Sequence, residues 1–133
     1  MSNERYFYGN QAFLSGQLNW TSDIFRICLV DTTQYVFLQA VHQTLADVPL
    51  TAQVAISPAL TGTTATNGVA VANTVVIPSV SGPLIKALII FKDTGTRGTS
   101  TLVAYLDTVV GLPVNPQGRS ISIAWDPLGI FRL

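Results

Sequence analysis

The strongest constraint on the fold is a pattern of two apolar strands joined by a polar turn. The runs "LIKALIIFKD" (84–93) and "TLVAYLDT" (101–108) have strand length and are rich in Val, Ile, Leu and aromatic residues, as strands are. Between them lies "TGTRGTS". Asp93 can accept hydrogen bonds from backbone amides two residues further on, and Gly95 or Gly98 can adopt a positive φ. The pattern therefore predicts a β-hairpin.

Other apolar runs of strand length follow one another along the chain, with turn-forming residues between them. They are "IFRICLVD" (24–31), "YVFLQAV" (35–41), "AQVAIS" (52–57), "TVVIPSV" (74–80) and "RSISIAWD" (119–126). In the last run, Ile121, Ile123 and Trp125 alternate with small residues, as in a half-buried strand. This spacing predicts an all-β fold, and specifically a single-domain antiparallel β-sandwich of the jelly-roll or Greek-key type.

Two shorter segments complete the expected architecture. "HQTLADVP" (42–49) is expected to form a short helical turn that ends before Pro49, because a residue preceding proline resists the helical conformation. Phe131, in the tail "GIFRL", is expected to close the core or to lie on a last edge strand.

Residues 1–20 are predicted to be an extended N-terminal arm ahead of a β-sandwich domain at 21–133. The arm is rich in aromatic residues but has no sustained helical period. Its rings must be buried either on its own domain or on a neighbouring protein, and the sequence leaves both open. Tyr6, Phe7 and Tyr8 are predicted to contact another protein.

No charged residue occurs between Asp47 and Lys86. Disordered segments usually combine low hydrophobicity with high net charge, whereas this one is uncharged and rich in Val and Ala. We therefore expect it to be ordered against a partner surface, and the alternative is a mobile Thr/Gly loop. The residues of this segment predicted to contact another protein are Thr61, Thr63, Thr64, Asn67, Val69, Val71 and Asn73.

Few charges cover the 133-residue chain. Only 11% of its residues are charged, its net charge is zero and its mean hydropathy is +0.42, whereas a soluble domain has about 25% charged residues. We infer that other subunits cover much of the surface, and the alternative is a surface rich in Thr, Ser and Asn. The chain has no basic patch for nucleic acid and no apolar run approaching the roughly 18 residues of a membrane helix.

The N-terminus lacks the layout of a signal peptide, so the chain is expected to stay in the cytoplasm where it is made. Cys28 is the only cysteine. It cannot form an internal disulfide or a cysteine-based metal site, and its apolar surroundings indicate a small buried side chain. We predict no cofactor and no metal.

The string Asp93-Thr94-Gly95-Thr96 matches the catalytic motif of aspartic proteases. The retroviral members of that class are homodimers of chains of about this length. Two such carboxylates share one proton. The context differs, because Lys92 stands where an apolar residue normally precedes the aspartate and a polar loop follows. The residues therefore favour a turn, and we predict that the protein is not an enzyme.

His42 is the only histidine, and Asp47 is its neighbour in sequence. No nucleophile accompanies them, so a catalytic triad has little support. A capping or hydrogen-bonding histidine is favoured.

Several motifs together resemble a family of small virion proteins of tailed bacteriophages. The motifs are "FLSGQLNWTSDIFRICLVDT", "HQTLADVP", "ALIIFKDTG" and "LVAYLDTVVGLPVNPQGRSISIAWD" followed by "GIF". The resemblance spans nearly the whole chain and is weakest at 58–82. The sequence departs from the family pattern at Val48, Arg97 and Gln117-Gly118-Arg119. These positions are expected to lie in turns and on the surface.

The resemblance implies a structural protein of the virion, assembled in the host cytoplasm. It favours a capsid cement or decoration protein, whose partners would be the major capsid protein and itself, as a dimer or trimer. An alternative is a tail, neck or fibre module that binds a receptor or glycan through Trp20, Tyr105 or Trp125. A further alternative is a dimeric aspartic protease that uses Asp93. Nucleic acid and membrane are not expected partners.

Overall fold

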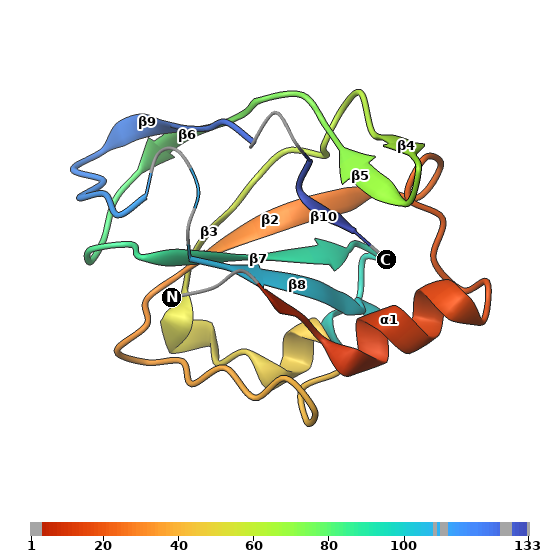
Figure 1. Ribbon diagram of the computed structural model, residues 1–133. Helices are drawn as coiled ribbons and strands as arrows, with labels where there is room; N and C mark the ends of the chain where they lie inside the picture. The colour runs from red at the N-terminus through yellow and green to blue at the C-terminus, as the bar shows by residue number, and fades with distance from the viewer. Residues whose placement is uncertain (1–3, 108, 110–111, 126–128, 133) are drawn as a thin grey trace.

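A computed structural model describes residues 4–107, 109, 112–125 and 129–132, and its largest element is a five-stranded antiparallel sheet (Figure 1). The sheet order is β1-β8-β7-β2-β3. The strands are β1 (Glu4–Arg5), β8 (Leu102–Leu106), β7 (Ala87–Lys92), β2 (Phe25–Val30) and β3 (Gln53–Ile56). Adjacent strands β7 and β8 form the hairpin that the sequence predicts.

Two small antiparallel sheets lie together over one face of the large sheet (Figure 1). One has the order β10-β5-β4 and the other pairs β6 with β9. Their strands are β4 (Thr64–Thr66), β5 (Val69–Val71), β6 (Val75–Val80), β9 (Arg119–Ile123) and β10 (Phe131–Arg132). The prediction of an antiparallel, mainly β fold is confirmed, and the second layer is divided between two sheets. Asp126, at the end of the predicted strand 119–126, lies outside the described residues.

The large sheet is buried on both faces, which explains why its central strands are apolar throughout. In β7, Leu88 and Ile90 belong to a core beneath the two small sheets, whereas Ile89 and Phe91 belong to a second core on the opposite face. Side chains alternate across a strand, so a strand covered on both sides needs apolar residues at every position.

The second core is covered by the segment that follows β2, which includes the 3-10 helices η1 (Leu45–Asp47) and η2 (Leu50–Ala52). The short helical turn predicted before Pro49 is thus confirmed. The strand predicted at 35–41 is wrong, because this segment forms turns and irregular backbone. Both edges of β2 are already paired, with β3 and β7. The apolar side chains of 35–41 therefore serve to cover the sheet face, as Tyr35 does.

The first 20 residues are part of the fold, and the prediction of an extended arm is corrected. Within them, β1 pairs with β8 and helix α1 (Phe7–Leu14) packs beside it. Tyr6 is fully buried and Trp20 lies in the first core. A Cβ at Gly9 would lie 2.5 Å from the carbonyl oxygen of Leu102, so only glycine permits this close approach of α1 to β8. Residues 1–3 lie outside the described residues.

The uncharged segment is ordered on its own chain. Its centre is the hairpin β4–β5, whose turn residues Asn67 and Gly68 have φ of 54° and 78°. Two successive positive φ values characterise the type I′ turn, and Asn-Gly is its preferred sequence. Strand β5 also pairs with β10, and Ala70 contributes to the first core. No helix in the described part of the chain is long and apolar enough to cross a membrane.

Candidate functional site: an apolar surface beside helix α1

The Asp-Thr-Gly-Thr motif forms a turn at the end of β7. The Oδ1 atom of Asp93 accepts a hydrogen bond from the backbone amide of Gly95 at 2.9 Å, and Oδ2 accepts one from Nε of Arg26 at 2.6 Å. Gly95 has a φ of +85°, so the predicted turn chemistry is confirmed. The Gly95 amide and the Arg26 guanidinium together hold the pKa of Asp93 below its usual range, because both stabilise the ionised carboxylate.

His42 ends a chain of hydrogen bonds that begins in the second core. The hydroxyl groups of Tyr6 and Tyr35 lie 2.7 Å apart, and the hydroxyl of Tyr35 lies 2.7 Å from Nδ1 of His42. The hydrogen-bonding role predicted for His42 is confirmed. Burial raises the pKa of Tyr35 to about 12 and raises that of Tyr6 further. The chain fixes the segment after β2 on the sheet and satisfies two buried hydroxyl groups.

Asp47 belongs to a separate cap at the start of η1. Its carboxylate accepts hydrogen bonds from the backbone amides of Gln43 and Thr44, at 2.8 and 3.1 Å. Both residues therefore have structural partners on the segment that covers the second core.

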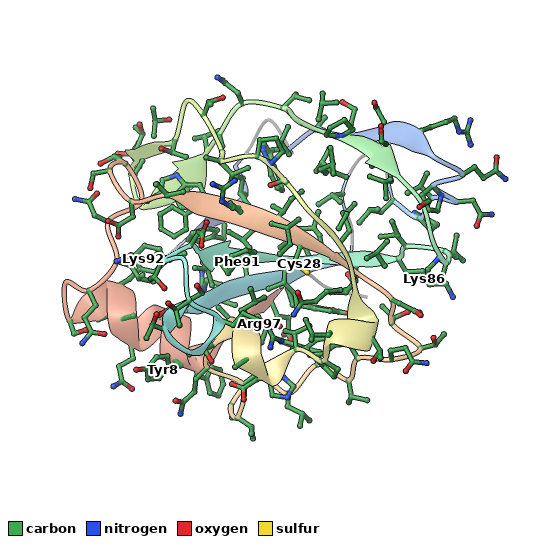
Figure 2. The ribbon with its side chains drawn as sticks, turned by 180° about the vertical axis from the view of Figure 1, so that it is seen from behind. Tyr8, Cys28, Lys86, Phe91, Lys92 and Arg97 are labelled. Carbon is green, nitrogen blue, oxygen red and sulfur yellow. The ribbon has the colours of Figure 1, made fainter. Side chains whose placement is uncertain are left out.

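Cys28 is completely buried in the second core, as predicted. Figure 2 shows Cys28 and Phe91 in the sheet layer, with Arg97 beside the segment that carries η1. Burial raises the pKa of the thiol to about 12, so the sulfur is neutral near pH 7. Among the described residues, no three His, Cys, Asp or Glu side chains gather in a possible metal site.

The three aromatic residues considered for glycan binding occupy different environments. Trp20 is 5% exposed and donates from Nε1 to the carbonyl oxygen of Val71, so its predicted availability to a ligand is corrected. Tyr105 is half-buried and stacks on Phe37, with ring centroids 4.6 Å apart. Trp125 packs against the first core. The structure does not bring these three rings together in one cleft among the described pockets.

The residues predicted to contact another protein also differ in accessibility. Tyr6 is 0% exposed, so its predicted role as an intermolecular contact is corrected. Its ring packs edge-on against Phe37 within its own chain. Phe7 is 54% exposed and Tyr8 is half-buried. In the uncharged segment, Thr61, Thr64, Asn67 and Asn73 are exposed, whereas Thr63, Val69 and Val71 are half-buried.

The exposure of several apolar side chains on α1 and on the loop bonded to it was not predicted from the sequence. Leu14 on α1 is 84% exposed, and Leu38 and Val41 on the neighbouring loop are 45% and 64% exposed. The Phe7 amide donates to the carbonyl oxygen of Gln39 at 3.1 Å, which joins the loop to the start of α1. We call Phe7, Leu14, Leu38 and Val41 the α1 face.

The α1 face comes from two segments that lack acidic and basic residues. No Asp, Glu, Lys or Arg occurs at 6–22 or at 32–46. This shared absence of charge is the sequence signal that could have identified the surface. It did not, because only the fold places the two segments side by side.

Comparison with models of known protein families finds no match to this chain. A comparison with curated proteins finds no match either.

Proposed function

We propose that this protein is a structural subunit of a bacteriophage particle, and specifically a capsid cement protein that binds the lattice of the major capsid protein. The observation that carries the proposal is the α1 face. It exposes four large apolar side chains on segments with no charged residue, and large exposed apolar patches are typical of protein interaction sites. The resemblance of the sequence motifs to small virion proteins supports the choice of a bacteriophage particle.

A cement protein stabilises a shell by mass action, because a partner that binds only the assembled state shifts the equilibrium toward that state. The proposal includes self-association into dimers or trimers, which would match the local symmetry of a shell. The proposal also includes a jelly-roll-like β-sandwich arrangement of the two layers. It assigns the protein no catalytic activity and no cofactor, and it places the protein in the virion.

Co-sedimentation with purified empty capsids, and separately with tails, tests the proposal. We expect saturable binding to capsids and a higher melting temperature of the bound shell. The variant Leu14→Glu should lose most of this binding, because an ionised side chain cannot be buried cheaply in an apolar contact. Val76→Glu is a matched control, since Val76 is 50% exposed on β6. Binding to tails alone, or equal loss in both variants, would contradict the proposal.

A further inference from the structure

A groove opens between the two layers of the fold, beside strand β1. A cavity of about 320 Å³ is lined by residues of β1, α1, β8 and β10, by Ile130 and by Gln39 on the loop after β2. Both β1 and β10 are edge strands of their sheets. The apolar part of the wall is formed by Phe7, Leu106, Ile130 and Phe131. The groove therefore combines apolar and polar side chains beside two strand edges. On the β1 edge, the carbonyl oxygen of Arg5 already accepts a hydrogen bond at 2.8 Å from Nε2 of Gln39.

Two buried polar atoms in this wall lack partners. Arg5 Nε and Asn10 Oδ1 are buried, and neither forms a hydrogen bond within the described part of the chain. One is a donor and the other is an acceptor. A buried polar atom without a partner is destabilising. A peptide group supplies one acceptor and one donor, so an inserted backbone segment could satisfy both atoms.

The guanidinium of Arg5 also lacks a counter-ion among the described residues. Register places Arg5 opposite Ala104 and Glu4 opposite Tyr105. Side chains opposite each other lie on the same face of a sheet, so Arg5 points to the face of the first core and Glu4 to the other face. Glu4, although it borders the groove, is therefore poorly placed to neutralise Arg5.

We propose that this groove binds an extended peptide segment of a partner protein, with an apolar side chain seated between the layers and a carboxylate paired with Arg5. Arg pairs with carboxylates through two parallel hydrogen bonds, and the unpaired Arg5 Nε and Asn10 Oδ1 atoms belong to residues that line the same groove. The proposed function enters only as the source of the segment, which would be a neighbouring subunit of the particle.

A second copy of β1 is a poor occupant of the same edge. If two β1 strands paired across a two-fold axis perpendicular to the sheet, residues on the same face would stand opposite each other. Glu4 would then oppose Glu4, or Arg5 would oppose Arg5. Like charges directly opposite on paired strands are destabilising, so pairing with a second copy of β1 is disfavoured.

The test uses the isolated, isotope-labelled full chain and two peptides, acetyl-Val-Leu-Asp-Val-amide and its Asn counterpart. Amide chemical shifts are followed during titration. We expect saturable changes at Arg5, Asn10, Ala104 and Phe131 with the acidic peptide. Affinity should fall at least tenfold, which corresponds to about 1.4 kcal/mol, both for the Asn peptide and for the variant Arg5→Gln.

Arg119→Gln is the matched control, because Arg119 is exposed on β9 and its loss removes the same charge elsewhere. Asn10→Ala provides a second groove variant if Arg5→Gln fails to fold. Equal affinity for the two peptides, changes confined to other surfaces, or no saturable change would overturn the proposal. So would contacts showing that the chain's own terminal residues fill the groove. None of these outcomes depends on binding to capsids, so the two proposals fail separately.

Discussion

The hydrogen-bond chain from Tyr6 through Tyr35 to His42 predicts unequal effects of two similar substitutions. Tyr35→Phe leaves the fully buried hydroxyl of Tyr6 without a partner, which should cost about 1–3 kcal/mol. Tyr6→Phe should cost less, because Tyr35 keeps its bond to His42. Urea unfolding of the two variants measures the difference. Equal losses of unfolding free energy would contradict this account of the chain.

The Asp93 turn predicts a dependence of stability on pH. The pKa of Asp93 is lower in the folded state than its model-peptide value, so its contribution is present above the unfolded pKa of about 3.9. It is lost as the pH falls through the folded pKa. At pH 7, Asp93→Asn should reduce the unfolding free energy by about 0.2–1 kcal/mol, since the pair with Arg26 is partly exposed.

Unfolding free energies of the wild type and Asp93→Asn, compared at pH 7 and in acid, test this prediction. The difference should shrink in acid, because the protonated wild-type side chain no longer pairs with Arg26 as an ion. A difference that stays constant across this range would show that the carboxylate charge does not contribute.

At the scale of elements, the close approach of α1 to β8 predicts that Gly9→Ala is destabilising. Alanine normally stabilises a helix by about 1 kcal/mol relative to glycine. Here its Cβ would lie 2.5 Å from a backbone oxygen of Leu102. Such overpacking typically costs about 1–3 kcal/mol, so the helix should shift and stability should fall.

Thermal unfolding of Gly9→Ala measures this loss, and Gly98→Ala is its control. No atom outside its chain neighbours lies within 4 Å of a Cβ placed on Gly98, so that variant should unfold close to the wild-type temperature. An unchanged or higher melting temperature for Gly9→Ala would contradict the packing seen between α1 and β8.

The strands that the sequence predicted correctly have local signals, and the errors arise from neighbours distant in sequence. β7 and β8 are apolar runs on either side of a turn rich in glycine, and both form as predicted. The run 35–41 has an equally strong strand composition. In the fold, β3 and β7 occupy both edges of β2, and composition does not encode which strands pair.

The candidate surface was only partly predictable for the same reason. Phe7 was identified because it lies in an aromatic cluster, but the burial of Tyr6 beside it depends on the pairing of β1 with β8. Val41 was assigned to a strand, so its exposure was not foreseen. Sequence indicated which segments lack charge, whereas the fold determined which of their side chains face outward.

The whole molecule has the surface area of an ordinary monomer. Its accessible surface is 6770 Å², and a folded monomer of 14.2 kDa is expected to expose about 6800 Å². The chain thus buries as much surface as a self-sufficient domain does. The exposed α1 face therefore lies on a domain whose accessible surface is of ordinary size.

The exposure of the α1 face predicts the behaviour of a double variant, Leu14→Glu with Val41→Glu. Both side chains are mostly exposed. The unfolding free energy of the isolated domain should therefore change by no more than about 0.5 kcal/mol. If the α1 face mediates self-association, sedimentation velocity should show the wild type as a dimer or trimer and the variant as a monomer. Loss of the folded state in the variant would instead assign these side chains to the core. An unchanged oligomer would assign self-association to another surface, such as the exposed residues of the β4–β5 hairpin.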